Sequence, residues 1–275
     1  MLKKPSGPLV PFIIFTAQRA GAAKLAFLVT MMERFFSATR KIDPQTQPIF
    51  TSDSILLLSG PRSCGKTSLL FQFALNSVLE SSSSNAYVVF ICNRTRLENN
   101  PPFLSQGVDP SSDVFERIHM KYVEDDEGLK KYFAAFHLHE ISPTAVIVDD
   151  FGDFFDDSKC QAKYNSQRGR DLAMVRTLAL CQDAIMHANE KLDSGNSCKL
   201  LISDTYLGDT PRSLFIYKRW ASSIFTTKGN GEGSYLLSSS SSSEQKKLKS
   251  SQLFVFLLFE SLPLLVQFVF SFQIG

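Results

Sequence analysis

Unbroken apolar runs alternate with segments of helical periodicity through the middle of the chain. Short apolar runs that end in turn residues are typical of buried parallel strands. The pattern predicts such strands at residues 55–58, 87–92, 145–148 and 199–203, with a further apolar patch at 113–120. Apolar side chains at helical spacing predict helices over residues 67–79, 129–139 and 170–190. Because strands alternate with helices, the sequence predicts an α/β fold with a mainly parallel sheet flanked by helices.

A β-hairpin is predicted where this pattern ends. Residues 221–237, ASSIFTTKGNGEGSYLL, contain two β-rich runs around a glycine-rich turn, which predicts a C-terminal β-hairpin at the edge of the sheet. The 275 residues are enough for one such domain with a core of its own. We therefore expect the domain at residues 50–237, between an N-terminal arm at 1–49 and a linker and tail at 238–275.

The N-terminal arm is basic. Its first 41 residues hold one acid, Glu33, and seven basic residues: Lys3, Lys4, Arg19, Lys24, Arg34, Arg40 and Lys41. We interpret this stretch as an extended, weakly structured arm, with translation starting at Met31 or Met32. The alternative is an organellar transit peptide, which is also basic and poor in acids.

The C-terminal tail joins a serine run at residues 238–243 to an apolar run at 253–272, which is long enough to cross a bilayer. Glu260 interrupts the apolar run, and a charge near the centre of a membrane helix costs about 2.5 kcal/mol or more. Pro263 and Gln267 interrupt it as well. Tracts of Phe, Leu, Val and Ser are what U-rich codons encode. We therefore interpret the tail first as translated non-coding sequence, second as a tail anchor and third as a buried helix, and we expect no membrane partner for the domain.

Charge and cysteine content exclude some classes of protein. The net charge of +2 gives no whole-protein attraction to DNA, so a nucleic-acid site has to be a local patch. The five cysteines are an odd number and form no Cys-x-x-Cys pair. This spacing argues against a disulfide framework or a zinc site and favours a reducing compartment.

A phosphate-binding loop is predicted between the first strand and the first helix. Residues 60–67, GPRSCGKT, fit the pattern G-x-x-x-x-G-K-[ST] in the expected context. Glycines let backbone N–H groups converge on phosphate oxygens, and the following helix N-terminus adds positive partial charge. In this pattern the lysine, Lys66, reaches the β- and γ-phosphates and the Thr67 hydroxyl is a Mg²⁺ ligand. The predicted ATP-binding residues are Gly60, Pro61, Arg62, Ser63, Cys64, Gly65, Lys66, Thr67 and Ser68.

Two acids follow the strand at 145–148. Asp149 stands where a second acid would complete the Mg²⁺ shell, and Asp150 is a candidate to orient water or to act as a base. The alternative is an ordinary strand end with solvated acids. Asp153, Asp156 and Asp157 are interpreted as a solvated loop.

Other nucleotide-binding classes fit less well. Residues 149–152 match the D-x-x-G of a GTPase, but no Asn-Lys-x-Asp follows the next strand. Residues 150–152 spell the Asp-Phe-Gly of a protein kinase, but no His-Arg-Asp loop precedes them. No LSGGQ-like segment indicates a transporter ATPase. A RecA-type ATP-binding fold or a P-loop kinase of a small substrate remains.

Three segments carry a resemblance to a known family: ILLLSGPRSCGKTSLLFQFALNSV, YVVFICNRTRLENNPP and FERIHMKYVEDDEGLKKYFAAFHLHEISPTAVIVDDFGDFF. In content and order they resemble the RecA-type recombinase paralogues, in particular the small ATPases that partner a SWIM-type zinc-finger protein in Shu-type complexes. The resemblance covers about residues 50–237. It implies a RecA-like P-loop NTPase core with ATP and Mg²⁺ as cofactors.

The resemblance also implies a biological role. It implies binding of single-stranded DNA, assembly with the SWIM-type protein and with other recombinase paralogues, and support of homologous-recombination repair of double-strand breaks. The nucleus is the expected location, and the basic arm leaves an organelle as the alternative.

A DNA contact is implied by the segment KYNSQRGRDLAMVRTL, which is similar to the recombinase segment where a basic loop precedes a long helix. Phosphate contacts and base stacking would come from Lys163, Tyr164, Arg168 and Arg170. The alternative is a solvated basic loop.

One departure from the family concerns catalysis. Recombinases carry a glutamate at the exit of the second strand, whereas this chain has Arg94 near that place. A cation cannot accept a proton from water, although it can stabilise phosphate charge. We therefore expect weak, DNA-dependent ATP hydrolysis that uses Lys66 and Asp150, with Thr205 as a γ-phosphate sensor. The alternatives are a small-molecule kinase with Arg168 and Arg170 in a lid, or a nucleotide-holding scaffold without turnover.

Overall fold

A computed structural model describes most of the chain between residues 31 and 272. The described residues are 31–32, 34–36, 55–81, 83, 85–103, 108–109, 111–156, 158–192, 197–207, 210–211, 213–229, 234–241, 252–257 and 269–272. Residues 1–30 of the basic stretch, the serines after 241 and the interruptions at Glu260, Pro263 and Gln267 lie outside these ranges. Asp157 lies outside them as well.

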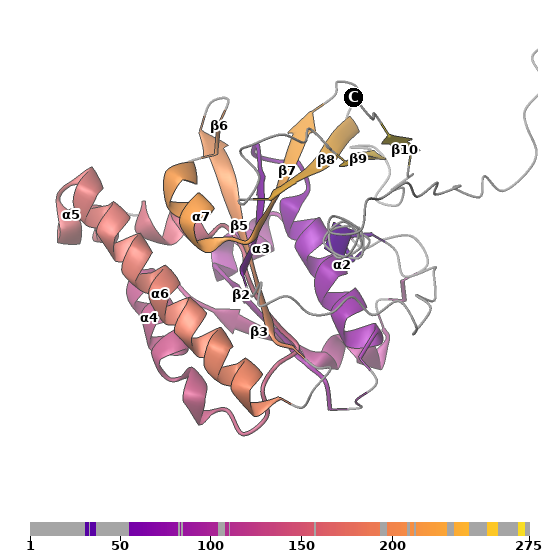
Figure 1. Cartoon of the computed structure of the whole chain (residues 1–275), viewed down its shortest axis with the longest axis horizontal. Helices are drawn as coiled ribbons and strands as arrows, with labels where there is room; N and C mark the ends of the chain where they lie inside the picture. Colours follow the sequence, from indigo (N-terminus) through magenta and orange to yellow (C-terminus); the bar gives the residue numbers. More distant parts are fainter. Residues whose placement is uncertain are drawn as a thin grey trace, which may run out of the picture.

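A mostly parallel sheet forms the centre of the molecule, in the order β10-β9-β8-β7-β1-β5-β4-β2-β3 (Figure 1). The strands are β1 (Ile55–Gly60), β2 (Val88–Cys92), β3 (Ile118–Tyr122), β4 (Ala145–Val148), β5 (Lys199–Leu207), β6 (Thr210–Pro211), β7 (Ser223–Gly229), β8 (Ser234–Ser241), β9 (Gln252–Leu257) and β10 (Val269–Phe272). From β3 to β7 neighbouring strands pair in parallel, and from β7 to β10 they pair antiparallel. The short β6 pairs with the end of β5.

Helices cover both faces of the sheet. They are α2 (Lys66–Leu79), α3 (Arg94–Asn99), α4 (Asp126–Ala134), α5 (Ser158–Tyr164), α6 (Gln167–Lys191) and α7 (Leu214–Trp220), with the 3₁₀ turns η2 (Asp113–Arg117), η3 (Phe136–Leu138) and η4 (Phe151–Phe155). Figure 1 shows α2 on one side of the sheet and α4 and α6 on the other. The molecule is therefore an α/β protein of a type compatible with a Rossmann or a RecA-like fold.

Two hydrophobic cores lie on the two faces of the sheet. Successive side chains of a strand point to opposite faces, so Ile55 and Leu57 join the core under α4, α6 and α7. Leu56 and Leu58 join the core under α2. Burial on both faces explains why this central strand is apolar throughout its first four residues.

The predicted strands and helices are confirmed, with some changes at their ends. Residues 145–148 form β4 as predicted, and the patch at 113–120 is divided between η2 and β3. The helix predicted at 129–139 is replaced by α4 and the separate turn η3. Three short helices were not predicted: α3, α5 and α7.

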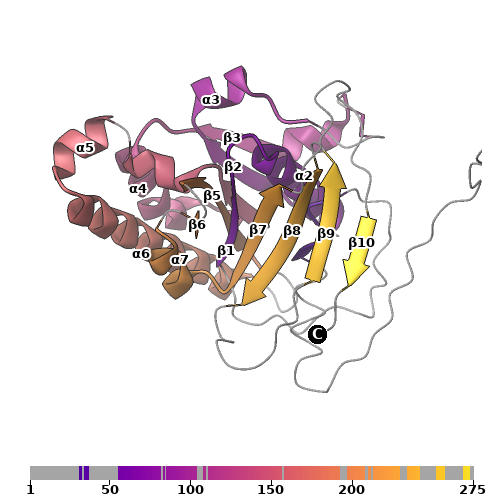
Figure 2. The ribbon, with the colours of Figure 1, turned by 90° about the horizontal axis from the view of Figure 1, so that it is seen from above.

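The predicted hairpin is confirmed as β7 and β8, but its position at the sheet edge is wrong. Figure 2 shows β9 and β10 continuing the sheet beyond β8. Strand β8 also runs to Ser241, past the expected domain limit at residue 237. The described parts of the apolar tail are strands, so a buried helix is wrong for residues 252–257 and 269–272. Across the described residues, no helix is both long and apolar enough to cross a membrane.

A piece of the N-terminal arm belongs to the core. Met31, Met32, Phe35 and Phe36 are buried in the cluster under α2. The Asn76 amide donates to the carbonyl oxygens of Arg34 and Phe36, so the segment is also held through its backbone. The expectation of a weakly structured arm is therefore wrong for these residues.

Candidate nucleotide-binding site

The candidate site lies at the carboxyl edge of the parallel strands. There β1 passes between β5 and β7 and leads through residues 61–65 into α2. Strand β4, on the far side of β5, ends at the same edge. Ligands of open α/β sheets bind in crevices at this edge.

Two residues of the loop at 61–65 have a left-handed backbone. Ser63 has φ 58° and Gly65 has φ 79°, a region that favours glycine. The turn allows successive N–H groups to face one point, as in the anion-binding concavities called nests. Gly65 also precedes a helix whose N-terminus has no side-chain cap and no acid in its first turn. The first amides of α2 therefore remain available to an anion.

Gly60 is required because β7 lies close to the loop. A Cβ atom on Gly60 would stand 1.7 Å from Thr227 Oγ1 and 2.8 Å from Cys64 Sγ. The two facing atoms form a hydrogen bond of 3.0 Å, and the Thr227 hydroxyl also donates to the Ser59 carbonyl at 3.4 Å. From β8, the Tyr235 hydroxyl donates to the Ser63 carbonyl at 3.4 Å. The hairpin therefore fixes the loop from one side, a role that we did not predict.

Lys66 is the first residue of α2 and is almost fully buried. Its Nζ donates to the Pro61 carbonyl at 3.0 Å, so the ammonium group lies across the mouth of the loop. Arg62 is exposed, and the Ser68 hydroxyl accepts from the Phe103 amide at 2.9 Å.

Thr67 and Asp149, the predicted metal ligands, face each other. The Thr67 hydroxyl donates to Asp149 Oδ2 at 2.8 Å, and the Ser203 hydroxyl donates to Asp149 Oδ1 at 2.8 Å. Val148 pairs in register with Ile202, which places Ser203 beside Asp149. We did not assign a role to Ser203, and its position at the end of a buried strand next to the acid-bearing strand was the available signal.

Asp150 is held beside Asp149 by residues of β5. Its backbone is left-handed at φ 49°, its N–H donates to Ser203 Oγ at 2.8 Å, and its Oδ1 accepts from the Thr205 hydroxyl at 2.7 Å. Backbone conformations of this kind are sparsely populated and concentrate at functional sites. The expected sensor, Thr205, thus contacts the expected catalytic acid.

The surroundings of Asp149 disfavour its charged form. Desolvation and the neighbouring Asp150 raise the pKa of Asp149 to about 6, against the hydrogen bonds from Ser203 and Thr67. Burial, with Asp149 nearby, also raises the pKa of the Cys92 thiol, to about 12. A bound cation would therefore stabilise the charged forms of the two adjacent carboxyl groups.

Arg94 makes its contacts with residues of α3 and β3. It is the first residue of α3, where its Nε donates to Glu98 at 2.9 Å and its guanidinium lies 5.0 Å from the centre of the Tyr122 ring. These contacts direct Arg94 to an exposed ion pair rather than to phosphate. The expected contribution of Arg94 to phosphate charge is therefore not supported by its contacts.

The predicted DNA contacts do not form a loop. Lys163 and Tyr164 end α5, and Arg168 and Arg170 lie in the first turn of α6, which Ser166 caps at Gly169 N (3.1 Å). The predicted basic loop is therefore wrong in its secondary structure.

Acids of the same protein neutralise part of this basic segment. Lys163 Nζ lies 2.5 Å from Glu127, and the Tyr164 hydroxyl donates to Asp126 at 2.7 Å. Arg170 Nε lies 3.8 Å from Asp156. Arg168 is exposed. Three of the four residues are thus already engaged, and their role in DNA binding stays a prediction.

The later acids were interpreted as a solvated loop, and this is wrong for Asp153. It lies on η4 and forms an ion pair with Arg96 of α3. Asp156 follows at the end of the same turn. The pair between Arg96 and Asp153 joins the segments that leave β2 and β4.

Neither a scan against protein-family models nor a search of curated proteins found a match for this chain.

Proposed function

We propose that this chain binds ATP with Mg²⁺ at residues 60–68 and acts as a RecA-type recombinase-paralogue subunit. The observation that carries the proposal is the pair of hydrogen bonds that Asp149 accepts from the hydroxyls of Thr67 and Ser203. Thr67 follows Lys66 in the first turn of α2. A hydroxyl and a carboxylate oxygen 2.8 Å apart, next to an uncapped helix start, form a donor set that suits Mg²⁺ and phosphate together.

Each residue would have a defined task towards the nucleotide. Backbone amides of residues 61–67 would bind phosphate oxygens, and Lys66 would exchange the Pro61 carbonyl for a phosphate oxygen. Thr67 and Asp149 would hold Mg²⁺, which supplies charge neutralisation when bound. Ser203 would keep Asp149 oriented, since its hydroxyl joins that carboxylate to the Asp150 amide.

Hydrolysis would be slow. No acid stands at the exit of β2, where the recombinases carry a glutamate, and Arg94 is paired with Glu98. Asp150, next to the proposed metal ligand Asp149, would accept a proton from water, and Thr205 restrains it. General-base catalysis contributes about 10²–10⁴-fold in typical enzymes, so its partial loss favours a weak ATPase.

The role in recombination follows from the resemblance. A recombinase paralogue of this kind would bind single-stranded DNA and work in the nucleus with a SWIM-type zinc-finger protein and other paralogues in the repair of double-strand breaks. Arg168, which is exposed on α6, is the predicted DNA contact that remains available. ATP would then act as a switch for assembly rather than as a fuel.

A nucleotide-holding scaffold without turnover is the second candidate function. The observation that favours it is the engagement of Arg94 with Glu98 and Tyr122 at the place of the missing glutamate. A small-molecule kinase is less favoured, because Arg168 and Arg170 lie in a helix rather than in a lid.

ATP turnover measured with and without single-stranded DNA tests these functions. The proposal expects slow hydrolysis that single-stranded DNA stimulates and that Asp150→Ala lowers by about tenfold or more. Glu140→Gln, an exposed acid beyond the turn η3, is the control and should leave turnover unchanged. Binding without turnover would favour the scaffold, and phosphate transferred to a small acceptor would favour the kinase. Co-purification with a SWIM-type protein tests the assembly.

A further inference from the structure

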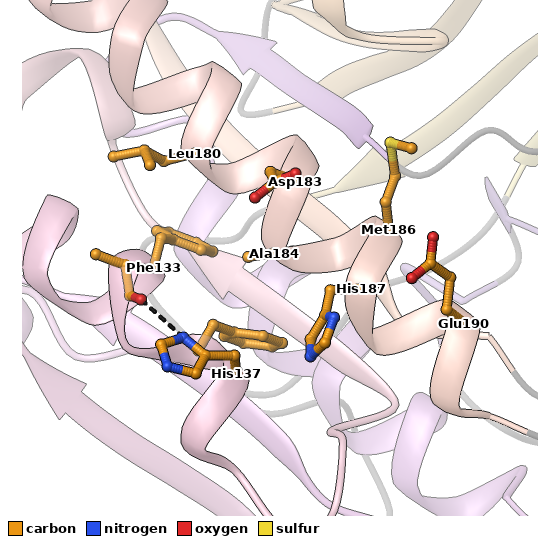
Figure 3. Close-up of a pocket in the computed structure, with 10 residues that line it drawn as sticks. Phe133, His137, Leu180, Asp183, Ala184, Met186, His187 and Glu190 are labelled. Atoms are coloured by element: carbon orange, nitrogen blue, oxygen red, sulfur yellow. Dashed lines mark hydrogen bonds between the residues drawn. The ribbon is translucent and has the colours of Figure 1, made fainter.

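A cavity of about 440 Å³ lies away from the candidate nucleotide site, between α6 and the segment formed by the end of α4 and η3 (Figure 3). Helix α4 follows β3, and the last turns of α6 precede β5. The end of α4 and the last turns of α6 therefore lie at the amino edge of the parallel strands, opposite the loop at 61–65. Phe133 and Phe136 are buried and line the cavity with their rings.

Charged and polar groups of α6 line the other side. Asp183 and Glu190 are exposed carboxylates, and neither has an ion pair within the described residues. His187 stands between them at spacings of four and three residues, so the three side chains share one side of the helix. The Nε2 atom of His187 is buried and has no hydrogen-bond partner. Buried polar atoms without a partner are uncommon and call for an explanation.

One lining side chain is apolar and exposed: Met186 from α6 is 50% exposed. Leu138, which follows the lining residue His137 in η3, is 72% exposed. Figure 3 shows Met186 and Glu190 projecting from the same stretch of α6. Aromatic lining, an unpaired imidazole nitrogen and free carboxylates thus occur within one depression that has an apolar rim.

We propose that this cavity binds an arginine side chain, with its apolar neighbours, from a segment of a partner protein. The aliphatic stem and planar guanidinium of arginine would pack against the rings of Phe133 and Phe136. Its five N–H donors would form hydrogen bonds to the exposed carboxylates of Asp183 and Glu190. Apolar residues beside the arginine would cover Met186 and Leu138.

Charge complementarity selects this occupant over two others. A nucleic acid would place phosphates near Asp183 and Glu190, and like charges at contact distance repel. Within the described residues, no group of His, Cys, Asp and Glu side chains has the arrangement needed for a metal ion. A cationic group on an apolar segment matches both the carboxylates and the aromatic lining.

The test is a selection of random linear peptides displayed on phage against the purified full chain. Bound peptides are then screened on the double variant Asp183→Asn/Glu190→Gln and on the control variant Asp171→Asn/Glu124→Gln. The control acids lie outside the cavity, and all four substitutions keep the shape of the side chain. The strongest peptide is synthesised with arginine and with uncharged citrulline, and calorimetry measures both affinities.

The proposal expects peptides that pair arginine with apolar residues, and an affinity about tenfold weaker for the cavity variant or for citrulline. The control variant should bind as the parent does. Selected peptides without a basic residue, or binding that the cavity substitutions leave unchanged, would overturn the proposal, as would a selection that yields no binding peptide. ATP affinity, measured on the same samples, should be equal in all variants.

Discussion

The hydroxyl groups of Thr67, Ser203 and Thr205 hold two adjacent carboxylates at the end of β4. Three short side chains from two elements thus position Asp149 and Asp150. Such positioning costs stability, because two acids share a poorly hydrated place. The arrangement makes sense if a cation binds there.

Binding of Mg·ATP should depend on the protonation of Asp149. Because the pKa of Asp149 is raised to about 6, the carboxyl is protonated below that pH and a proton then competes with Mg²⁺. Affinity should fall by up to about tenfold per pH unit below about pH 6. Calorimetric titrations at about pH 5 and about pH 7.5 check this. The Asp149→Asn variant should show a weaker affinity without that pH dependence, and an equally steep profile in the variant would contradict the assignment.

Gly60→Ala should destabilise the protein because its Cβ would meet Thr227 Oγ1 at 1.7 Å. Overpacking of this kind costs about 1–3 kcal/mol, which chemical denaturation can measure. The double variant Gly60→Ala/Thr227→Ala should recover part of this loss, since the colliding hydroxyl is gone. If the two substitutions had additive effects on the free energy of unfolding, the collision with the Thr227 hydroxyl would not be the cause of the loss.

At the level of elements, the sequence predicted the strands and helices that a clear hydrophobic period or a motif specifies. Strand β4 was found because four apolar residues precede two acids, and α2 because the phosphate-loop pattern fixes its start. The helices α3, α5 and α7 span six or seven residues, too few for a helical period to emerge.

The remaining features depend on tertiary contacts that no local pattern encodes. The burial of Met31 and Phe35 could not be predicted from the basic composition of the arm, because it depends on packing against α2. Ser203 looked like a strand end, and its role appears only when β5 pairs with β4. The contact of Thr227 with Gly60 joins residues far apart in the chain.

The segment at 31–36 should contribute to stability as a core element. The ring of Phe35 lies 5.3 Å from both the Phe73 and the Phe225 rings, measured between centroids. Phe35→Ala should therefore lower the free energy of unfolding by about 3 kcal/mol or more. Phe103→Ala is the control, because that side chain is 56% exposed and should cost less than about 0.5 kcal/mol. Equal effects of the two substitutions in denaturant unfolding would contradict the packing of this segment.

On the scale of the whole molecule, the sheet separates the two candidate sites. The carboxyl edge carries the candidate nucleotide site, and the amino edge carries the cavity between α4 and α6. Partner binding at the cavity would leave the nucleotide edge open. The two edges can be tested independently, because Asp183 and Lys66 lie on different helices at opposite ends of the strands.

The central claim is that Lys66 and the loop before it bind the phosphates of ATP. Calorimetric titration of Mg·ATP into the full chain, the Lys66→Ala variant and a Lys131→Ala control measures this most directly, since Lys131 is exposed on α4. We predict that the parent and the control bind with equal affinity, whereas Lys66→Ala loses about 2–3 kcal/mol or more, which is roughly 30-fold to 150-fold in affinity. Undiminished affinity in Lys66→Ala would contradict the account.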